Sequence, residues 1–187
     1  LAAESIGIPL VDVRPEDFEA DADPTEDSGE RGDRELEPLE RALFDLSEDL
    51  GGIGGLTAGA VESSYQTSRI EAMCERLDAE LFAPLWQEDP RELADEMLEA
   101  GFEIRIVRVA AYGLDESWLG RTLDTEAIAD LETLNEEYGV HILGEGGEFE
   151  TLVTDAPHMD RPIELEYETT FDGSRGSLRI TDAWLGD

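Results

Sequence analysis

The sequence contains no lysine, and its 13 basic residues are all arginine. Against 48 acidic residues they leave a formal net charge of −35 at pH 7. The absence of lysine excludes any mechanism in which a lysine of this chain binds the phosphates of a nucleotide. The shortage of positive charge also disfavours direct binding to nucleic acid, which needs a basic surface against its phosphates.

Cysteine and histidine are nearly as scarce. The one cysteine, Cys74, allows neither an internal disulfide nor a metal cluster built from cysteines. It lies on an apolar helical stripe, so we expect it in the core. His141 and His158 are isolated from other metal-ligating residues, and we interpret them as structural or surface residues. The identity of any bound metal is unknown at this point.

Long hydrophobic runs are also missing. No run approaches the roughly 18 apolar residues of a membrane span, and the first residues lack the charged and apolar regions of a signal peptide. We therefore expect a cytoplasmic protein with no membrane partner. The 187 residues, of which 40% are hydrophobic, suffice for one large or two small domains.

The acidic residues are spread through nearly every predicted helix. Mutual repulsion on this scale destabilises a compact state at low ionic strength, whereas at 1 M salt a Debye length of ~3 Å screens it. A protein that binds a polycation would cluster its acids instead. The pattern therefore predicts a halophilic protein adapted to molar salt.

Strand-like and helix-like segments alternate along residues 1–100, which predicts an α/β domain with a parallel sheet. We expect strands at 8–13, 56–61 and 81–86, and helices at 1–6, 35–50, from 63 and from 90. Residues 14–34 are acidic with few apolar side chains, which predicts a disordered insertion. For residues 101–187 we expect a smaller α/β domain. Its elements are a strand at 102–111, a helix at 125–138 and a C-terminal hairpin that turns at Asp172 and Gly173.

The segment Gly144–Thr151 is the strongest candidate site. It holds three glycines in four positions and three carboxylates within six residues: Glu145, Glu148 and Glu150. The glycines free the backbone for close approach to a ligand, and strand alternation would point Glu148 and Glu150 the same way. Two acids on one side could share a cation or an amine. The alternative is a glycine turn surrounded by solvated acids.

A second candidate is the strand, turn and helix over residues 56–71. Ser63 and Gln66 fit a capping box, and Arg69 lies about one and a half turns into the helix. Backbone N–H groups at a helix N-terminus after a buried strand form an anion site. The alternative is an ordinary capped helix.

Three runs of the sequence, at 59–69, 111–121 and 144–157, together resemble the diphthine–ammonia ligase family of ATP pyrophosphatases. The resemblance implies a Rossmann-like (HUP-type) nucleotide domain at 1–100 and a substrate domain at 101–187. It also implies the reaction: ATP adenylates the carboxylate of diphthine on translation elongation factor 2, and ammonia displaces AMP. ATP and Mg²⁺ are the implied cofactors, and a homo-oligomer is left open.

The family motifs carry over to three groups of residues. Those on the nucleotide side are Gly59, Ser63, Tyr65, Gln66 and Arg69. Those on the substrate side are Gly113, Leu114, Asp115, Leu119, Gly120, Gly146, Gly147 and Thr151. As catalytic residues that bind ammonium or metal or act as a base we expect Glu145, Glu148 and Glu150.

The chain departs from the family in one respect. Members carry a Ser-Gly-Gly-Lys-Asp-Ser pyrophosphate loop after their first strand, and this sequence has none. We therefore expect an N-terminally truncated nucleotide domain, through truncation or loss, and a chain that is an incomplete enzyme by itself. Two alternatives stay open: another ATP pyrophosphatase that amidates or thiolates a nucleotide or tRNA, and a non-catalytic binding protein.

Overall fold

The structure is a computed structural model that describes residues 1–13, 28–59 and 64–187, for 28–35 and 64–66 by their backbone alone. The chain divides into two compact units, one formed by Leu10–Gln87 and the other by Leu1–Pro9 with Glu88–Asp187. Each contains helices and strands, which confirms the predicted α/β class. The division falls one helix before residue 100, because α4 (Pro90–Ala100) packs on the later strands through Ala94.

The unit Leu10–Gln87 contains α2 (Ser28–Leu50), β1 (Gly55–Thr57), α3 (Ser64–Leu77) and β2 (Glu80–Phe82). The two short strands pair in parallel, as the alternation of elements predicts. Cys74 on α3 is buried, as expected. Within the described part of this unit these are the only strands, so the Rossmann-like sheet stays a prediction.

Two local expectations for the first hundred residues are wrong. Residues 8–13 form no strand, because none of the described segments pairs with them and Leu10 is 74% exposed. Helix α2 begins at Ser28, so residues 28–34 of the expected insertion are helical and Pro38 lies inside the helix. Glutamate and arginine, frequent in this segment, favour helix, and the acidic composition alone misled the prediction. Residues 14–27 lie outside the described part of the chain.

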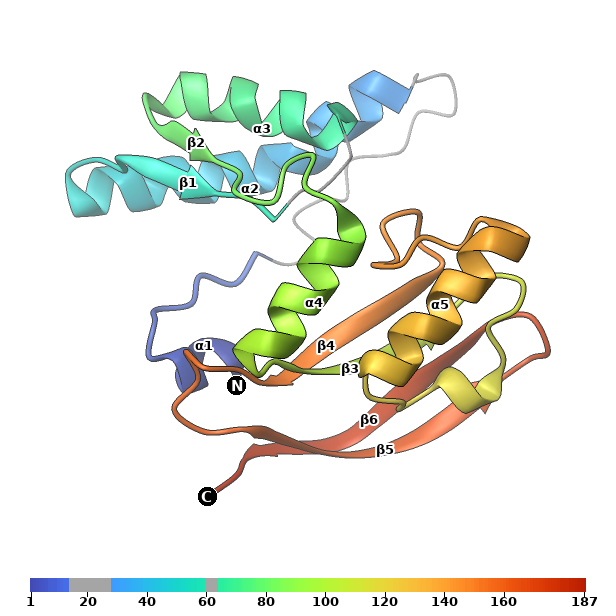
Figure 1. Cartoon of the computed structure of the whole chain (residues 1–187). Coiled ribbons are helices and arrows are strands. Elements are labelled where there is room, and N and C mark those ends of the chain that lie inside the picture. The colour runs from blue at the N-terminus through green and yellow to red at the C-terminus, as the bar shows by residue number, and fades with distance from the viewer. Residues whose placement is uncertain (14–27, 60–63) are drawn as a thin grey trace. The chain divides into compact units, whose positions relative to one another are not determined.

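The second unit is a four-stranded antiparallel sheet with α4 and α5 (Thr125–Tyr138) on one face (Figure 1). The strands lie in the order β4 (Phe149–Asp155), β3 (Glu103–Val109), β6 (Gly176–Leu185), β5 (Ile163–Phe171). Two short helices complete the unit: α1 (Ala2–Ile6) and the 3₁₀ helix η2 (Glu116–Trp118). The predicted hairpin is β5 and β6, whose turn is closed by Asp172 accepting N–H groups from Ser174 and Arg175.

The core between this sheet and its helices is built from inward-facing aliphatic side chains. Ile104, Ile106 and Val109 of β3 pack against Ile128 and Leu131 of α5, all with at most 3% exposure. Burial of side chains of this size contributes about 1.5–3 kcal/mol each, so β3 and α5 form the stable frame of the unit. No helix in the described residues is long and apolar enough to cross a membrane.

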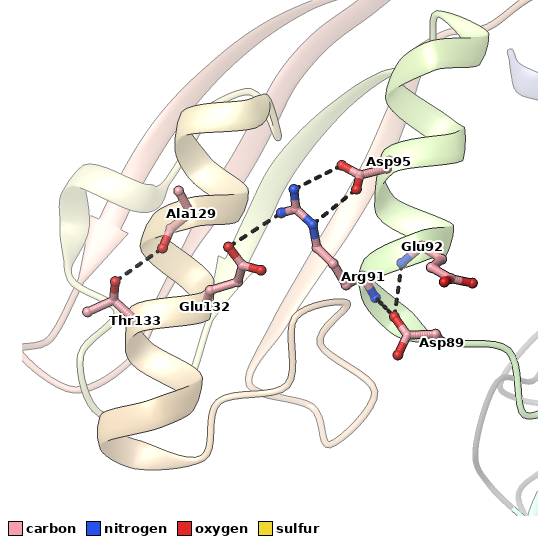
Figure 2. Close-up of polar contacts among 7 residues, drawn as sticks. All are labelled: Asp89, Arg91, Glu92, Asp95, Ala129, Glu132 and Thr133. Carbon is pink, nitrogen blue, oxygen red and sulfur yellow. Dashed lines mark hydrogen bonds and ion pairs between the residues drawn. The ribbon is translucent and has the colours of Figure 1, made fainter.

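Helices α4 and α5 begin where the sequence places their caps. Asp89 accepts N–H groups from Arg91 and Glu92, and Asp124 accepts the N–H of Ala127. The Arg91 guanidinium lies between the two helices, 3.1 Å from an oxygen of Asp95 and 3.5 Å from one of Glu132 (Figure 2). These groups are partly exposed, so each pair contributes at most about 1 kcal/mol.

Candidate functional site

The glycine–acid loop, residues 144–148, lies between the end of α5 and the start of β4. It is fixed beside the end of β3, because the Ala110 N–H donates to the Glu148 carbonyl at 2.7 Å. Within the loop the Gly147 N–H donates to the Gly144 carbonyl at 2.9 Å, which closes a tight turn. The loop is therefore an ordered turn at one end of the sheet.

Two of the glycines make close contacts. A Cβ added at Gly144, where φ is +74°, would lie 2.7 Å from the carbonyl oxygen of Phe149. A Cβ at Gly146 would lie 2.5 Å from Glu148 Oε1. The Glu148 carboxylate thus folds back over the bare backbone of Gly146, which only glycine permits.

Glu148 has an unusual environment for a carboxylate. Its Oε1 accepts a hydrogen bond from the backbone N–H of His141 at 3.2 Å. Its Oε2 is buried and has no hydrogen-bond partner among the described residues. A buried polar oxygen without a donor is costly, and this one is suited to accept a proton or to bind a cation. Glu148 is therefore the most distinctive group of the loop.

His141 organises the loop from its N-terminal side. Its Nδ1 accepts the N–H of Leu143 at 3.1 Å and lies 3.4 Å from the donating N–H of Glu145. This is the structural role that the sequence predicts for His141. Glu145 is exposed at the turn.

Glu150 is engaged separately from Glu148. It lies opposite Arg108 in the β3–β4 ladder, and its Oε1 is 2.6 Å from Arg108 Nη1. β4 begins only at Phe149, so strand alternation does not reach Glu148, and the two carboxylates have different partners. Their sharing of one ligand stays a prediction. In the ranges that the structure describes, no group of three or more His, Cys, Asp or Glu residues could hold a metal ion.

The substrate-side candidates at 113–120 have mainly structural contacts. Leu114 and Leu119 are buried in the core, and Gly120 donates its N–H to the Ile106 carbonyl at 2.8 Å. Asp115 caps η2 through the N–H and hydroxyl of Ser117, which hold the pKa of Asp115 below its ordinary value. Thr151 is exposed on β4.

Gly113 lies three residues after Ala110, whose backbone N–H donates to the Glu148 carbonyl. It has φ +93°, and an added Cβ would lie 2.7 Å from Leu134 Cδ2 and 3.1 Å from Tyr138 Cδ2. Its small size lets the loop after β3 pass against the C-terminal end of α5. Gly146, Gly147, Glu148 and Gly113 therefore lie on segments that meet at one end of the sheet.

The nucleotide-side candidates belong to the other unit. Gly59 follows β1 and is exposed, and Arg69 is partly buried on α3. Tyr65 and Gln66 lie in the first turn of α3, where only the backbone is described, and Ser63 lies outside the described residues. The predicted anion site at this helix N-terminus stays a prediction.

Sequence reasoning missed two tyrosines beside the loop. Tyr112 is 79% exposed and Tyr138 is 49% exposed, and their rings meet edge to face with centroids 4.9 Å apart. One feature of the sequence could have indicated them: Tyr112 directly precedes Gly113 in the run 111–121 that carries part of the family resemblance. Tyrosine is enriched at interfaces, because its ring is apolar and its hydroxyl is polar.

Comparison with known proteins gives one consistent answer. The family described as "Diphthamide synthase C-terminal domain" matches residues 89–185. The diphthine–ammonia ligase of Danio rerio is 37% identical over 171 residues, which cover 91% of this chain and 66% of that protein. That of Homo sapiens is 38% identical over 125 residues, covering 66% and 46%, and that of Saccharomyces cerevisiae is 40% identical over 140 residues, covering 67% and 20%. The chain thus spans less than two thirds of the length of these relatives.

Proposed function

Because the chain belongs to the diphthamide synthase family, we propose that it takes part in the ATP-dependent amidation of diphthine on translation elongation factor 2 with ammonia. The main structural support is the position of the Glu148 carboxylate, which folds over Gly146. Its Oε2 is buried and lacks a hydrogen-bond donor among the described residues. The names of its relatives supply the substrates, and Glu148 supplies a group that can handle ammonia.

The proposed reaction has two steps. A carboxylate oxygen of diphthine attacks the α-phosphorus of ATP, and pyrophosphate leaves. The nitrogen of ammonia then attacks the acyl carbon, the bond to the AMP oxygen breaks, and AMP leaves with that electron pair. The nitrogen releases one further proton to solvent, which gives the neutral amide. Since ammonium is the dominant species at pH 7, a base must first take one of its protons.

Glu148 is suited to this proton transfer. Its Oε2 can accept a hydrogen bond from ammonium and then the proton, while the His141 N–H at Oε1 fixes the orientation of the carboxylate. Glu145, exposed at the turn, would pass the proton to solvent. Glu150, paired with Arg108, contributes negative charge at the edge of the site.

The nucleotide would be bound by the other unit, at Gly59 and the start of α3, with Ser63, Tyr65, Gln66 and Arg69 against the phosphates. ATP is the cofactor that the relatives' reaction implies. The described acids of the chain do not gather into a Mg²⁺ site, so no step is assigned here to a metal.

Because this sequence has no pyrophosphate loop, the proposal is tested on the chain joined to the family's pyrophosphate-loop segment. The assay contains molar KCl, elongation factor 2 that carries diphthine, ATP and ¹⁵N-ammonium. Mass spectrometry follows the ¹⁵N amide, and AMP release reports adenylation. Glu148→Gln should lower amide formation by ~10²–10⁴, whereas Glu136→Gln, an exposed acid on α5, should not. If Glu148 handles ammonium, adenylation survives in the variant; if it binds a metal, adenylation falls too.

Two other outcomes would replace this function. Amidation of a nucleotide or tRNA in place of diphthine would indicate a different ATP pyrophosphatase, which the strongly acidic composition disfavours for tRNA. Binding of elongation factor 2 without any AMP formation would indicate a non-catalytic protein.

A further inference from the structure

The two tyrosines at the end of the sheet form an open corner. Their ring planes meet at 79°, with centroids 4.9 Å apart. Tyr112 leaves 79% of its surface exposed to solvent, so burial of this ring contributes little to folding. In this arrangement a ligand that sits in the corner can contact the faces of both rings.

Short chain segments connect both tyrosines to Glu148. Tyr112 lies two residues after Ala110. The backbone N–H of Ala110 donates to the Glu148 carbonyl. Tyr138 ends α5 three residues before His141, whose N–H donates to the Glu148 carboxylate. Gly113 allows this approach, because any Cβ there would collide with Leu134 and Tyr138.

The charge around the corner favours a cation. Residues 109–120 and 122–160 contain neither arginine nor lysine. The neighbouring Glu137 carboxylate, as an acceptor for the Tyr138 hydroxyl and as a negative charge, raises the pKa of that phenol. The electron-rich ring faces and the carboxylates therefore attract positive charge and repel phosphate.

We propose that Tyr112 and Tyr138 form a subsite for a quaternary ammonium group. This rests on the proposed function, since diphthine carries a trimethylammonium group on the same carbon as the carboxylate that is amidated. A trimethylammonium cation is bulky and weakly hydrated, so it gains more from two aromatic faces than ammonium does. Bound in the corner, it would hold the reacting carboxylate near Gly146 and Glu148.

The corner is tested by binding alone, without ATP or elongation factor 2. The probe is choline, added in molar KCl to protein with ¹³C-labelled tyrosine rings and followed by NMR. Its neutral isostere, 3,3-dimethylbutan-1-ol, has the same shape without the charge. Choline should shift the signals of Tyr112 and Tyr138, and the isostere should bind at least fivefold more weakly.

Matched variants assign the effect. Tyr112→Ala should weaken choline binding at least fivefold, and Tyr112→Phe, which keeps the ring, should restore most of it. Trp184→Ala removes an exposed aromatic residue of β6, next to the outer strand β5, and should change nothing. Because Tyr112 is so exposed, its variants should melt within a few degrees of the wild type.

Several results would overturn the proposal. Equal binding of the neutral isostere would show an ordinary apolar patch, and ring shifts by adenosine but not by choline would show a nucleotide-stacking site. In the amidation assay, Tyr112→Ala should raise the KM for elongation factor 2 more than it lowers kcat, whereas Glu148→Gln should lower kcat. Choline binding with no amidation would sink only the proposed function, and amidation that ignores Tyr112→Ala would sink only the subsite.

Discussion

Arg108 of β3 and Glu150 of β4 face each other directly across the ladder, and their Nη1 and Oε1 atoms are 2.6 Å apart. Both side chains are about half exposed, at 49% and 57%. Glu150 follows Glu148 and Phe149 directly in the chain. Its position makes Glu150 a neighbour of the proposed site whose own carboxylate already has a cationic partner.

This pairing predicts different outcomes for the two glutamates. Glu150→Gln should lower the free energy of unfolding by less than about 1 kcal/mol, because exposed pairs are weak and molar salt screens them. Amide formation should fall by roughly tenfold or less, well short of the loss in Glu148→Gln. Urea unfolding of Glu150→Gln, Arg108→Gln and the double variant measures the coupling. Equal loss of activity in Glu150→Gln and Glu148→Gln would contradict the assignment of the base.

Gly146→Ala tests the fold of the loop over Glu148. The new methyl group would lie 2.5 Å from Glu148 Oε1, so the carboxylate must move, while the side chain is flexible enough to spare the backbone. Stability should fall by less than about 1.5 kcal/mol, and amide formation by ~10²-fold, as a displaced catalytic group implies.

Gly147→Ala is the matched control for that variant. Its φ is +82°, so alanine is strained by about 1–2 kcal/mol, but no atom lies within 4 Å of the added Cβ. Melting temperature should therefore fall at least as much as in Gly146→Ala, with far less effect on the rate. The opposite order of activities would show that Glu148 does not act from its observed position.

Local chemistry explains which parts of this fold are predictable from the sequence. Helices α4 and α5 begin after Asp89 and Asp124 because short acidic side chains cap free N–H groups within a few residues. The hairpin is marked by Asp172 and Gly173 in the same way. Such signals are local, so they can be read without knowing the rest of the fold.

The features that the sequence did not predict depend on contacts between residues distant in the chain. Residues 8–13 have strand composition but no strand to pair with, and the direction of the Glu148 carboxylate is set by His141 and by the register of β4. Tyr138 ends α5 half exposed beside Tyr112, and this contact also depends on a segment distant in the sequence. The glycines of the candidate site were predictable, but the geometry of its acids was not.

Asp115 gives a prediction for acidic pH. Hydrogen bonds from Ser117 lower its pKa in the folded state, so the unfolded chain binds more protons as pH falls below the ordinary aspartate range near 3.9. The stability that Asp115 contributes is therefore complete above that range and is lost as pH falls through the lowered pKa. Asp115→Asn, which still accepts hydrogen bonds, should be within about 1 kcal/mol of the wild type at pH 7 and should show a smaller acid-side loss. Urea unfolding of both proteins between pH 3 and 7 measures the difference, and parallel curves would exclude this role.

The net charge of −35 predicts that folding depends on salt. Most ion pairs of the described residues lie at the surface, where each contributes little. The 13 arginines are too few to neutralise the 48 acidic residues. Dialysis from molar KCl to about 0.01 M lengthens the Debye length to ~30 Å, and repulsion among the acids then acts across the whole molecule. Far-UV circular dichroism should show loss of helix at low salt, recovered when KCl is restored. Titration to pH 4 at low salt, where many carboxylates are protonated, should restore part of the signal by lowering the charge itself. A spectrum and melting temperature that do not change between the two salt concentrations would refute adaptation to molar salt.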